Sequence, residues 1–269
     1  MMWYICGCLF ILGLIIGSFL NVVILRFDTG RSIAHGRSKC FSCGKELTWK
    51  ELFPLFSFLI QGGRCKECGT TISWQYPIVE FATGCLFALT YIKNPLQDFA
   101  LIPILLGIIT LALLSLYVVI CLYDFRHKII PDLFSYSAAV LSLIYIGVTY
   151  YSTRVLDLYS LIAGPILFCF FFFFWFVSKG RWMGLGDAKL ALSVGWFLGL
   201  SGGIAAILLS FWIGSIVSLL VILIQKFSHT NYGLGFKSEI PFGPYILLGF
   251  LIIWLSGINM GAILSVLAV

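Results

Sequence analysis

Residues 168–200 read FCFFFFFWFVSKGRWMGLGDAKLALSVGWFLGL, and this stretch decides the class of fold. An apolar, phenylalanine-rich run ends at Val177, a short basic and glycine-rich turn follows, and apolar sequence resumes after Asp187. A run of roughly 20 apolar residues is long enough to cross a membrane as a helix. The stretch therefore predicts two membrane helices joined by a short turn, with an aspartate where the chain re-enters.

The composition of the whole chain supports the same class. The sequence is 61% hydrophobic and only 10% charged, whereas about a quarter of the residues in an average soluble domain are charged. We therefore predict an all-α polytopic membrane protein. Its apolar segments predict about eight transmembrane helices, at residues 2–25, 77–93, 99–123, 133–151, 155–178, 188–200, 203–225 and 244–268. The first of these has no basic start and is too long for a cleavable signal peptide.

The basic residues predict the orientation of these helices. Fifteen of the 17 Lys and Arg residues fall in four segments, 26–76, 124–132, 179–189 and 226–243. Because basic loops stay on the cytoplasmic side, we expect these four segments on the cytoplasmic side of the membrane. Both chain termini are then expected on the opposite, outer side. The net charge of +6 is then a topology signal rather than a nucleic-acid-binding surface. We expect membrane lipid as a partner and no nucleic acid.

One long polar segment, residues 26–76, contains two cysteine pairs. Cys40 and Cys43 are followed after 21 residues by Cys65 and Cys68. Two such pairs are typical of a closed tetrahedral zinc site. The alternative is two disulfides, which the reducing inner side disfavours. We therefore predict three parts: a first transmembrane helix (1–25), a small cytoplasmic zinc-binding loop domain (26–76) and a transmembrane core (77–269).

Acidic residues are rare in this chain, and two of them fall at the same predicted depth. Asp124 ends the third apolar segment and Asp187 opens the sixth, both at the inner boundary. An ionisable group at that depth is costly and is a candidate functional residue. Two carboxyl groups that face each other share one proton, which provides a base and an acid for hydrolysis of a peptide bond.

Simpler roles for these aspartates remain open. An Asp that opens a helix commonly caps its free N–H groups; Asp132, which follows Pro131, fits that role well, and Asp187 also can take it. Gly184 and Gly186 let the backbone pass close to a substrate strand. The same carboxylates also suit an ion or proton path through a transporter.

Several motifs, in order, resemble those of the type IV prepilin peptidases, the leader peptidase and N-methyltransferase family of Gly-x-Gly-Asp membrane aspartic proteases. GLGDAKL at 184–190 is similar to that family's signature. The other motifs are GSFLNVVILR at 17–26, the two cysteine pairs, WQYPIVE at 74–80, D-x5-IPD at 124–132 and IPFGPY at 240–245. The resemblance covers residues 13 to 250.

The resemblance implies an activity and residues for it. Asp124 and Asp187 would be the catalytic pair, in preference to Asp132. The enzyme would remove a short basic leader from prepilins or pseudopilins, after a glycine, on the cytoplasmic side of the bacterial inner membrane. It would then methylate the new N-terminus with S-adenosylmethionine. The residues expected to contact substrate are Gly184, Gly186, Lys189, Pro241, Phe242, Gly243 and Pro244.

Other readings stay open at this point. Glu80 is a candidate methyltransfer residue, or an interfacial carboxylate paired with a basic neighbour. The Pro241–Pro244 segment either lines the site or starts a helix. Two other function classes are a multi-pass transporter or ion channel that uses the same aspartates, and a zinc-bearing membrane scaffold. Gly13 and Gly17, four residues apart, allow close packing of two helices.

Overall fold

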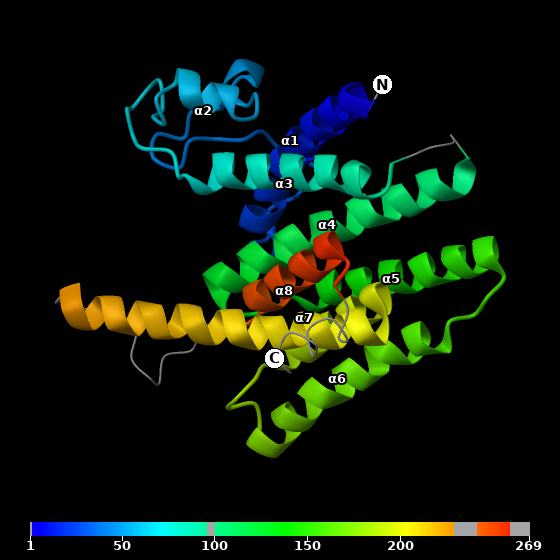
Figure 1. The fold of residues 1–269 in the computed structure, drawn as a ribbon. Helices are drawn as coiled ribbons and strands as arrows, with labels where there is room; N and C mark the ends of the chain where they lie inside the picture. Colours follow the sequence, from blue (N-terminus) through cyan, green and yellow to red (C-terminus); the bar gives the residue numbers. More distant parts are fainter. Residues whose placement is uncertain (1, 96–99, 229–240, 259–269) are drawn as a thin grey trace. The chain divides into compact units, whose positions relative to one another are not determined.

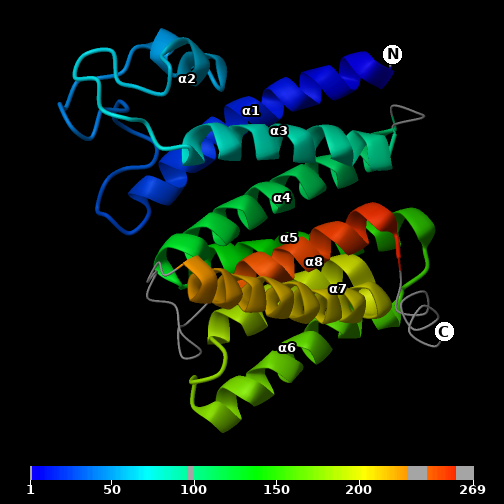
Figure 2. The ribbon, with the colours of Figure 1, turned by 60° about the vertical axis from the view of Figure 1, so that its left-hand side comes forward.

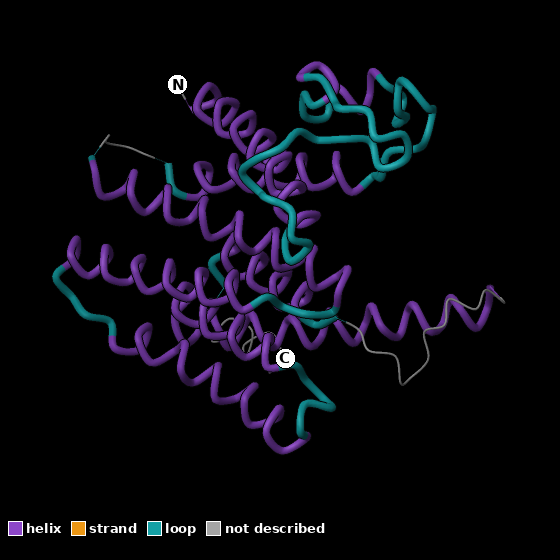
Figure 3. The backbone as a smooth tube through the Cα atoms, turned by 180° about the vertical axis from the view of Figure 1, so that it is seen from behind, coloured by secondary structure: helices purple, strands orange, loops and turns teal. Residues whose placement is uncertain are grey.

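The computed structural model describes residues 2–95, 100–228 and 241–258. Among these residues there is no strand, only two isolated β-bridges, and the rest is helix, turn and loop (Figure 3). The elements, in chain order, are α1 (Met2–Arg26), η1 (Trp49–Glu51), α2 (Phe56–Ile60), α3 (Gln75–Lys93), α4 (Leu101–His127), α5 (Asp132–Thr153), α6 (Leu158–Ser178), α7 (Leu185–Ser228) and α8 (Gly243–Ser256) (Figure 1). The all-α prediction is confirmed.

Five helices of the described chain are long and apolar enough to cross a membrane: α1, α4, α5, α6 and α7. The number of eight spans stays a prediction. The predicted span 244–268 begins as α8, and its part from 259 onward lies outside the described residues, as do residue 99 and most of the predicted inner segment 226–243. α4 extends to His127, so Asp124 lies inside a helix rather than after one.

The helix α7 reverses direction at Gly199. This residue has a left-handed, extended backbone (φ 72°, ψ 178°) that interrupts the helical dihedrals. A β-carbon added to Gly203 would lie 3.2 Å from the Cα atom of Gly195, although residues eight apart in a straight helix are separated by about 12 Å. α7 therefore consists of two antiparallel arms, 185–198 and 200–228, which correspond to the predicted spans 188–200 and 203–225.

The chain divides into two compact units, residues 1–119 and 120–269. In the first unit, α1 and α3 pack through glycine. A β-carbon on Gly13 would lie 2.7 Å from the Cα of Gly84, and one on Gly17 would lie 2.8 Å from the Cα of Glu80. Such distances leave no room for a side chain, so the two backbones touch. The close approach predicted from Gly13 and Gly17 is confirmed.

In the second unit, α7 packs against α5, α6 and α8, and Figure 2 shows it between α6 and α8. Glycines again permit the contacts. A β-carbon on Gly164 of α6 would lie 2.7 Å from the ring of Trp196, and one on Gly249 of α8 would collide with the carbonyl oxygen of Ala206. The apolar core of this unit includes the fully buried side chains of Phe171, Leu190, Val194, Ile246 and Phe250.

Candidate functional site

Asp124 lies in the last turns of α4, and its carboxyl group is buried. Its Oδ2 atom accepts a hydrogen bond of 3.0 Å from the backbone N–H of Gly243, at the start of α8. A helix has free N–H groups in its first turn, so the beginning of α8 stabilises a carboxylate that the apolar surroundings would otherwise disfavour. A β-carbon on Gly243 would lie 2.6 Å from Asp124 Oδ2, so this contact requires glycine.

Asp187 lies in the first turn of α7 and is also buried. Its Oδ2 atom accepts a hydrogen bond of 3.2 Å from the backbone N–H of Gly184, the residue directly before the helix. Asp187 is the third residue of α7 and accepts from the residue before the helix; this differs from the expected cap, in which an aspartate at the helix start accepts N–H groups of the helix itself. The contact engages one carboxylate oxygen and is compatible with a second role for the other. Gly184 itself is exposed.

The structure brings the two aspartates together. Ile130 lies against Gly186, the neighbour of Asp187, and against Gly243, whose N–H binds Asp124, so the two aspartates lie near each other although 63 positions separate them (187 − 124). Both belong to the 120–269 unit, where the end of α4 meets the starts of α7 and α8. Within the described residues, no hydrogen bond is made to Oδ1 of either carboxyl group. This is the arrangement that acid–base hydrolysis by a carboxyl pair needs.

Ile130 holds the three helix ends in place. A β-carbon on Gly186 would lie 2.8 Å from Ile130 Cβ, and one on Gly243 would lie 3.2 Å from Ile130 Cδ1. The buried side chain of Ile130 thus occupies the space that both glycines leave free. Ile130 belongs to the D-x5-IPD motif, but no feature of the sequence predicted this packing role. Gly186 contacts the chain's own Ile130 here, and its contact with a substrate stays a prediction.

The Pro241–Pro244 segment is fixed by aromatic packing. The ring of Phe242 lies 5.0 Å from that of Phe211 and 6.1 Å from that of Phe171, which is fully buried. Pro244 lies in the first turn of α8, so the expected helix start is also present. The aromatic cluster directs the N–H of Gly243 toward Asp124. Phe171 and Phe211 had no sequence signal, because nothing in their spacing points to Phe242.

Lys189 pairs with Asp132 rather than with the two buried aspartates. Its ammonium lies 2.6 Å from Asp132 Oδ1 and 5.1 Å above the ring of Tyr136. The expectation that Asp132 caps its helix is wrong. It is the first residue of α5, and Pro131, which precedes it, makes no side-chain capping bond. The pair links α5 to α7 two residues after Asp187, while contact of Lys189 with substrate stays a prediction.

The four cysteines of the 1–119 unit form one cluster. Each can offer its Sγ atom as a ligand, and these four atoms all lie within 4.8 Å of one another. Cys40 Sγ and Cys68 Sγ are 3.8 Å apart. Thiolates bound tetrahedrally at about 2.3 Å from zinc are about 3.8 Å apart. The cluster therefore fits a four-coordinate metal ion, and none of the four cysteines forms a disulfide.

The two cysteine pairs have the same backbone shape. Gly44 N–H donates to Cys40 O at 3.0 Å, and Gly69 N–H donates to Cys65 O at 2.9 Å. Both glycines have φ near +70° (73° and 70°), a conformation that favours glycine. Each Cys-x-x-Cys-Gly turn thereby aims two sulfurs at the same point.

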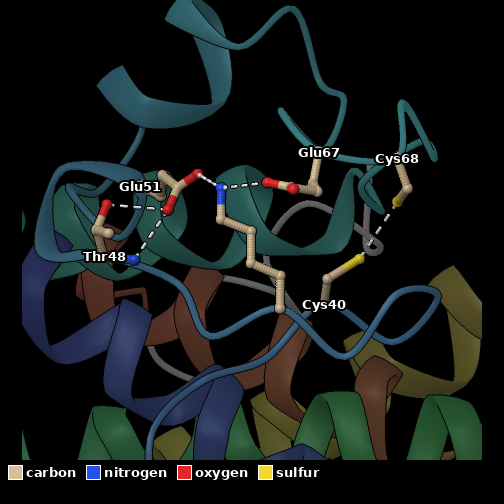
Figure 4. A network of polar contacts seen from close by, with 6 residues as sticks. Cys40, Thr48, Glu51, Glu67 and Cys68 are labelled. Carbon is tan, nitrogen blue, oxygen red and sulfur yellow. Dashed lines mark hydrogen bonds and ion pairs between the residues drawn. The ribbon is translucent and has the colours of Figure 1, made fainter.

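Polar contacts tie the two cysteine turns together (Figure 4). Lys45 Nζ lies 3.3 Å from Glu51 Oε1 and 3.3 Å from Glu67 Oε2, so it links the first turn to the second. The Thr70 hydroxyl and backbone N–H lower the pKa of the Cys68 thiol to about 6, which favours the thiolate that binds metal.

Glu80 also lies in the 1–119 unit, buried in α3. Its Oε2 atom accepts a hydrogen bond of 2.8 Å from the backbone N–H of Leu55. The expected alternative to a methyltransfer role was a carboxylate paired with a basic neighbour. Among the described residues no ion pair to Glu80 is found; its partners are the backbone amide of Leu55 and the side chain of Ser18.

The Lys189–Asp132 pair predicts an asymmetric response to mutation. The side chain of Lys189 is 10% exposed, whereas that of Asp132 is 67% exposed. Asp132→Asn leaves a buried ammonium without its ion-pair partner, which costs roughly 1–3 kcal/mol. Lys189→Met leaves a carboxylate that water can solvate, and its cost is smaller. Thermal unfolding in detergent should rank the Asp132→Asn variant below Lys189→Met; the reverse order would contradict the described burial.

The cysteine cluster predicts a metal content of about one ion per chain, as one closed four-ligand site requires. Cys65→Ser removes a buried ligand, and we expect the purified variant to retain less than half of the metal. Cys169→Ser, at an exposed cysteine of α6, is the matched control and should keep the parental content. Elemental analysis of both variants checks this, and equal metal in both would disprove the assignment of Cys65 as a ligand.

Comparison with known proteins places the chain in a family. Residues 11–94 match the bacterial peptidase A24 N-terminal domain, and residues 111–219 match the type IV leader peptidase family. Relatives named prepilin leader peptidase/N-methyltransferase include one from Bacillus subtilis, 30% identical over 250 residues that cover 93% of each chain. A second, from Klebsiella pneumoniae, is 33% identical over 204 residues, 71% of this chain and 84% of the relative.

A third relative of the same name, from Myxococcus xanthus, is 34% identical over 221 residues; the match covers 80% of this chain and 62% of the relative. No solved structure matches the chain significantly. The matched regions contain the cysteine cluster, Glu80, Asp124 and Asp187. The chain therefore belongs to the type IV leader peptidase family.

Proposed function

We propose that this chain is an aspartic endopeptidase of the bacterial inner membrane that removes the short basic leader of prepilins or pseudopilins. The observation that carries the proposal is the convergence of Asp124 and Asp187 in one buried site formed by separate helices. The family supports it, since its curated relatives are named prepilin leader peptidases.

The chemistry follows from two interacting carboxyl groups that hold one proton between them. The ionised group removes a proton from water, and the resulting oxygen nucleophile attacks the scissile carbonyl carbon. The protonated group donates its proton to the carbonyl oxygen. When the tetrahedral intermediate collapses, the C–N bond breaks and the leaving amine takes a proton. The N–H groups of Gly184 and Gly243 hold the carboxyl groups in position.

The surroundings of the pair fit a substrate with an apolar helix and a glycine before the cut. Gly184 and Gly243 present backbone rather than side chain beside the carboxyl groups, which suits an extended strand with a small residue at the cut. Pro241, Phe242 and Pro244 flank this backbone, and Lys189 lies two residues after Asp187 in α7. In the proposed orientation the N-terminus of the chain is outside, and the site faces the cytoplasm.

We further propose the three-part organisation predicted from the sequence, with zinc in the four-cysteine site and a structural role for it. Four thiolates are the ligand set that structural zinc prefers. The loop at 26–76 contains only two short helical segments, η1 and α2, so a metal ion would stabilise it. The relatives' names also support N-methylation of the new N-terminus, with S-adenosylmethionine as methyl donor and Glu80 as a residue of that site.

Removal of either carboxylate should abolish cleavage. We expect Asp124→Asn and Asp187→Asn each to reduce leader removal by at least about 100-fold, because each deletes the acid or the base of the reaction. The measurement is the mass of a prepilin co-expressed with each variant. Asp157→Asn, at the exposed N-cap of α6, is the control and should cleave normally. Parental cleavage by either site variant would refute the assignment of the pair.

Glu80→Gln tests the methyltransfer proposal separately. The amide oxygen can still accept the hydrogen bond from Leu55 N–H, while the negative charge is lost. We expect leader removal to continue and N-methylation of the product to fall about tenfold or more, as loss of a charged catalytic group would cause. Mass spectrometry of the mature substrate reports both steps. Full methylation by the variant would refute the methyltransfer role and leave Glu80 a structural role, through its contacts with Leu55 and Ser18.

A further inference from the structure

The loop that carries the metal site also carries an unusually apolar segment. Residues 52–60 read LFPLFSFLI, and they are called the apolar tip below. Five large side chains of the apolar tip are exposed: Leu52, Phe53, Phe56, Leu59 (71% exposed) and Ile60 (79% exposed). Single exposed apolar side chains are common, but a contiguous group of this kind marks a contact with lipid or with another protein.

One face of the apolar tip packs against the rest of the loop. The exposure of its other face is therefore a feature of the folded loop and not a result of missing packing. Phe58 of α2 is buried, and its ring lies 5.0 Å from that of Trp74. A short helix that is apolar on both its buried and its exposed face is typical of apolar surroundings. The exposed side of the apolar tip therefore needs an apolar environment outside the unit.

The depth of the apolar tip follows from its contact with α3. Leu55 N–H donates to Glu80 Oε2 at 2.8 Å, and Glu80 lies beside Gly17 of α1. Gly17 precedes the basic end of α1, Arg26, by nine residues (26 − 17), which is about 14 Å of helix. The backbone at Leu55 thus reaches the level of the apolar part of a membrane helix. Figures 1 and 2 both show α2 beside the first half of α3.

The hydrogen bond to Glu80 has a physical reason at that depth. In hydrocarbon, a backbone N–H without an acceptor is strongly unfavourable, because no water is present to bind it. Leu55 precedes α2 with φ 60° and ψ −53°, a conformation unfavourable for a branched side chain. A buried carboxylate that accepts this N–H stabilises the turn where water is scarce. The contact is what a re-entrant segment requires.

The residues around the apolar tip match a membrane surface. Trp49 is exposed, and Lys50 Nζ lies 5.6 Å from the centre of its ring. Trp74 is exposed on the other side of the tip, and Arg64 lies close by, lining the same hollow as Trp74. Tryptophan and basic side chains together are enriched where headgroups meet acyl chains.

We infer that the apolar tip inserts into the lipid bilayer, at the boundary of headgroups and acyl chains in the leaflet where α1 ends. It acts as a re-entrant anchor that holds the metal-binding loop against the membrane. Lipid, rather than a protein, is the inferred occupant because the backbone of the tip binds Glu80 at the depth of the α1 span, and α3 itself exposes the apolar side chains of Ile78 and Phe81 on either side of Glu80 in sequence. The inference does not depend on the proposed peptidase activity.

Photocrosslinking of the full chain in lipid nanodiscs tests this inference. The photoreactive residue p-benzoylphenylalanine is placed at Phe56 in the apolar tip and, as the matched control, at Phe41. Both are exposed phenylalanines of the same loop (56% and 75% exposed), but Phe41 lies in the first cysteine turn. Ile60 serves as a second position in the tip. The metal content of each variant, compared with the parent, reports whether the loop has folded.

We expect phospholipid adducts on the peptides that contain positions 56 and 60, at a yield at least several-fold above that at 41. Equal lipid labelling at all three positions would overturn the inference. So would adducts at 56 and 60 that join mainly to another part of the chain, to a second copy or to a prepilin. If the Phe56 variant loses its metal, the result at Ile60, whose side chain is the more exposed of the two, decides between these outcomes.

Discussion

Two carboxyl groups buried among apolar helices need hydrogen-bond donors, and the candidate site is built around that need. An unsatisfied buried acceptor costs about 1–3 kcal/mol, and more when it is charged. Asp124 receives the N–H of Gly243, and Asp187 receives the N–H of Gly184. Both donors are backbone groups at helix starts, which offer free N–H groups at no cost in side-chain entropy. The bond from Gly243 fixes the start of α8 against the end of α4. The bond from Gly184 is local to the start of α7, and Ile130 packs that start against the other two helix ends.

Glycine makes this arrangement possible in two ways. Within a membrane, helices gain little from the hydrophobic effect when they associate, so close backbone packing contributes much of their affinity. The contacts of Gly164 with Trp196 and of Gly249 with Ala206 hold α7 to its neighbours in this manner. At Gly243 the reason is different, because a β-carbon there would overlap the carboxylate itself. Packing and chemistry thus depend on the same residue type for separate reasons.

The 1–119 unit solves a related problem with different chemistry. Its loop has little apolar core, so two cysteine turns of matching shape and a lysine bridge, Lys45, hold it together. Glu80 connects this loop to α3 by accepting one backbone N–H. Glu80, for which the sequence left a reactive and a structural role open, therefore has a definite structural partner. A carboxylate that accepts the N–H of Leu55 satisfies this backbone group where water is scarce.

The sequence by itself determined the helical membrane class, the cysteine cluster and the approximate limits of most helices, because hydropathy and ligand spacing are local properties. It also indicated Asp124 and Asp187 as the candidate pair, through motifs in a fixed order. Only the tertiary structure decided which groups satisfy them. The contact of Gly243 with Asp124 joins residues 119 positions apart, and Ile130 fills space left by two glycines from different helices. The role expected for Asp132 was wrong for the same reason: its partner, Lys189, lies 57 positions away, and no local pattern records a contact that packing alone creates.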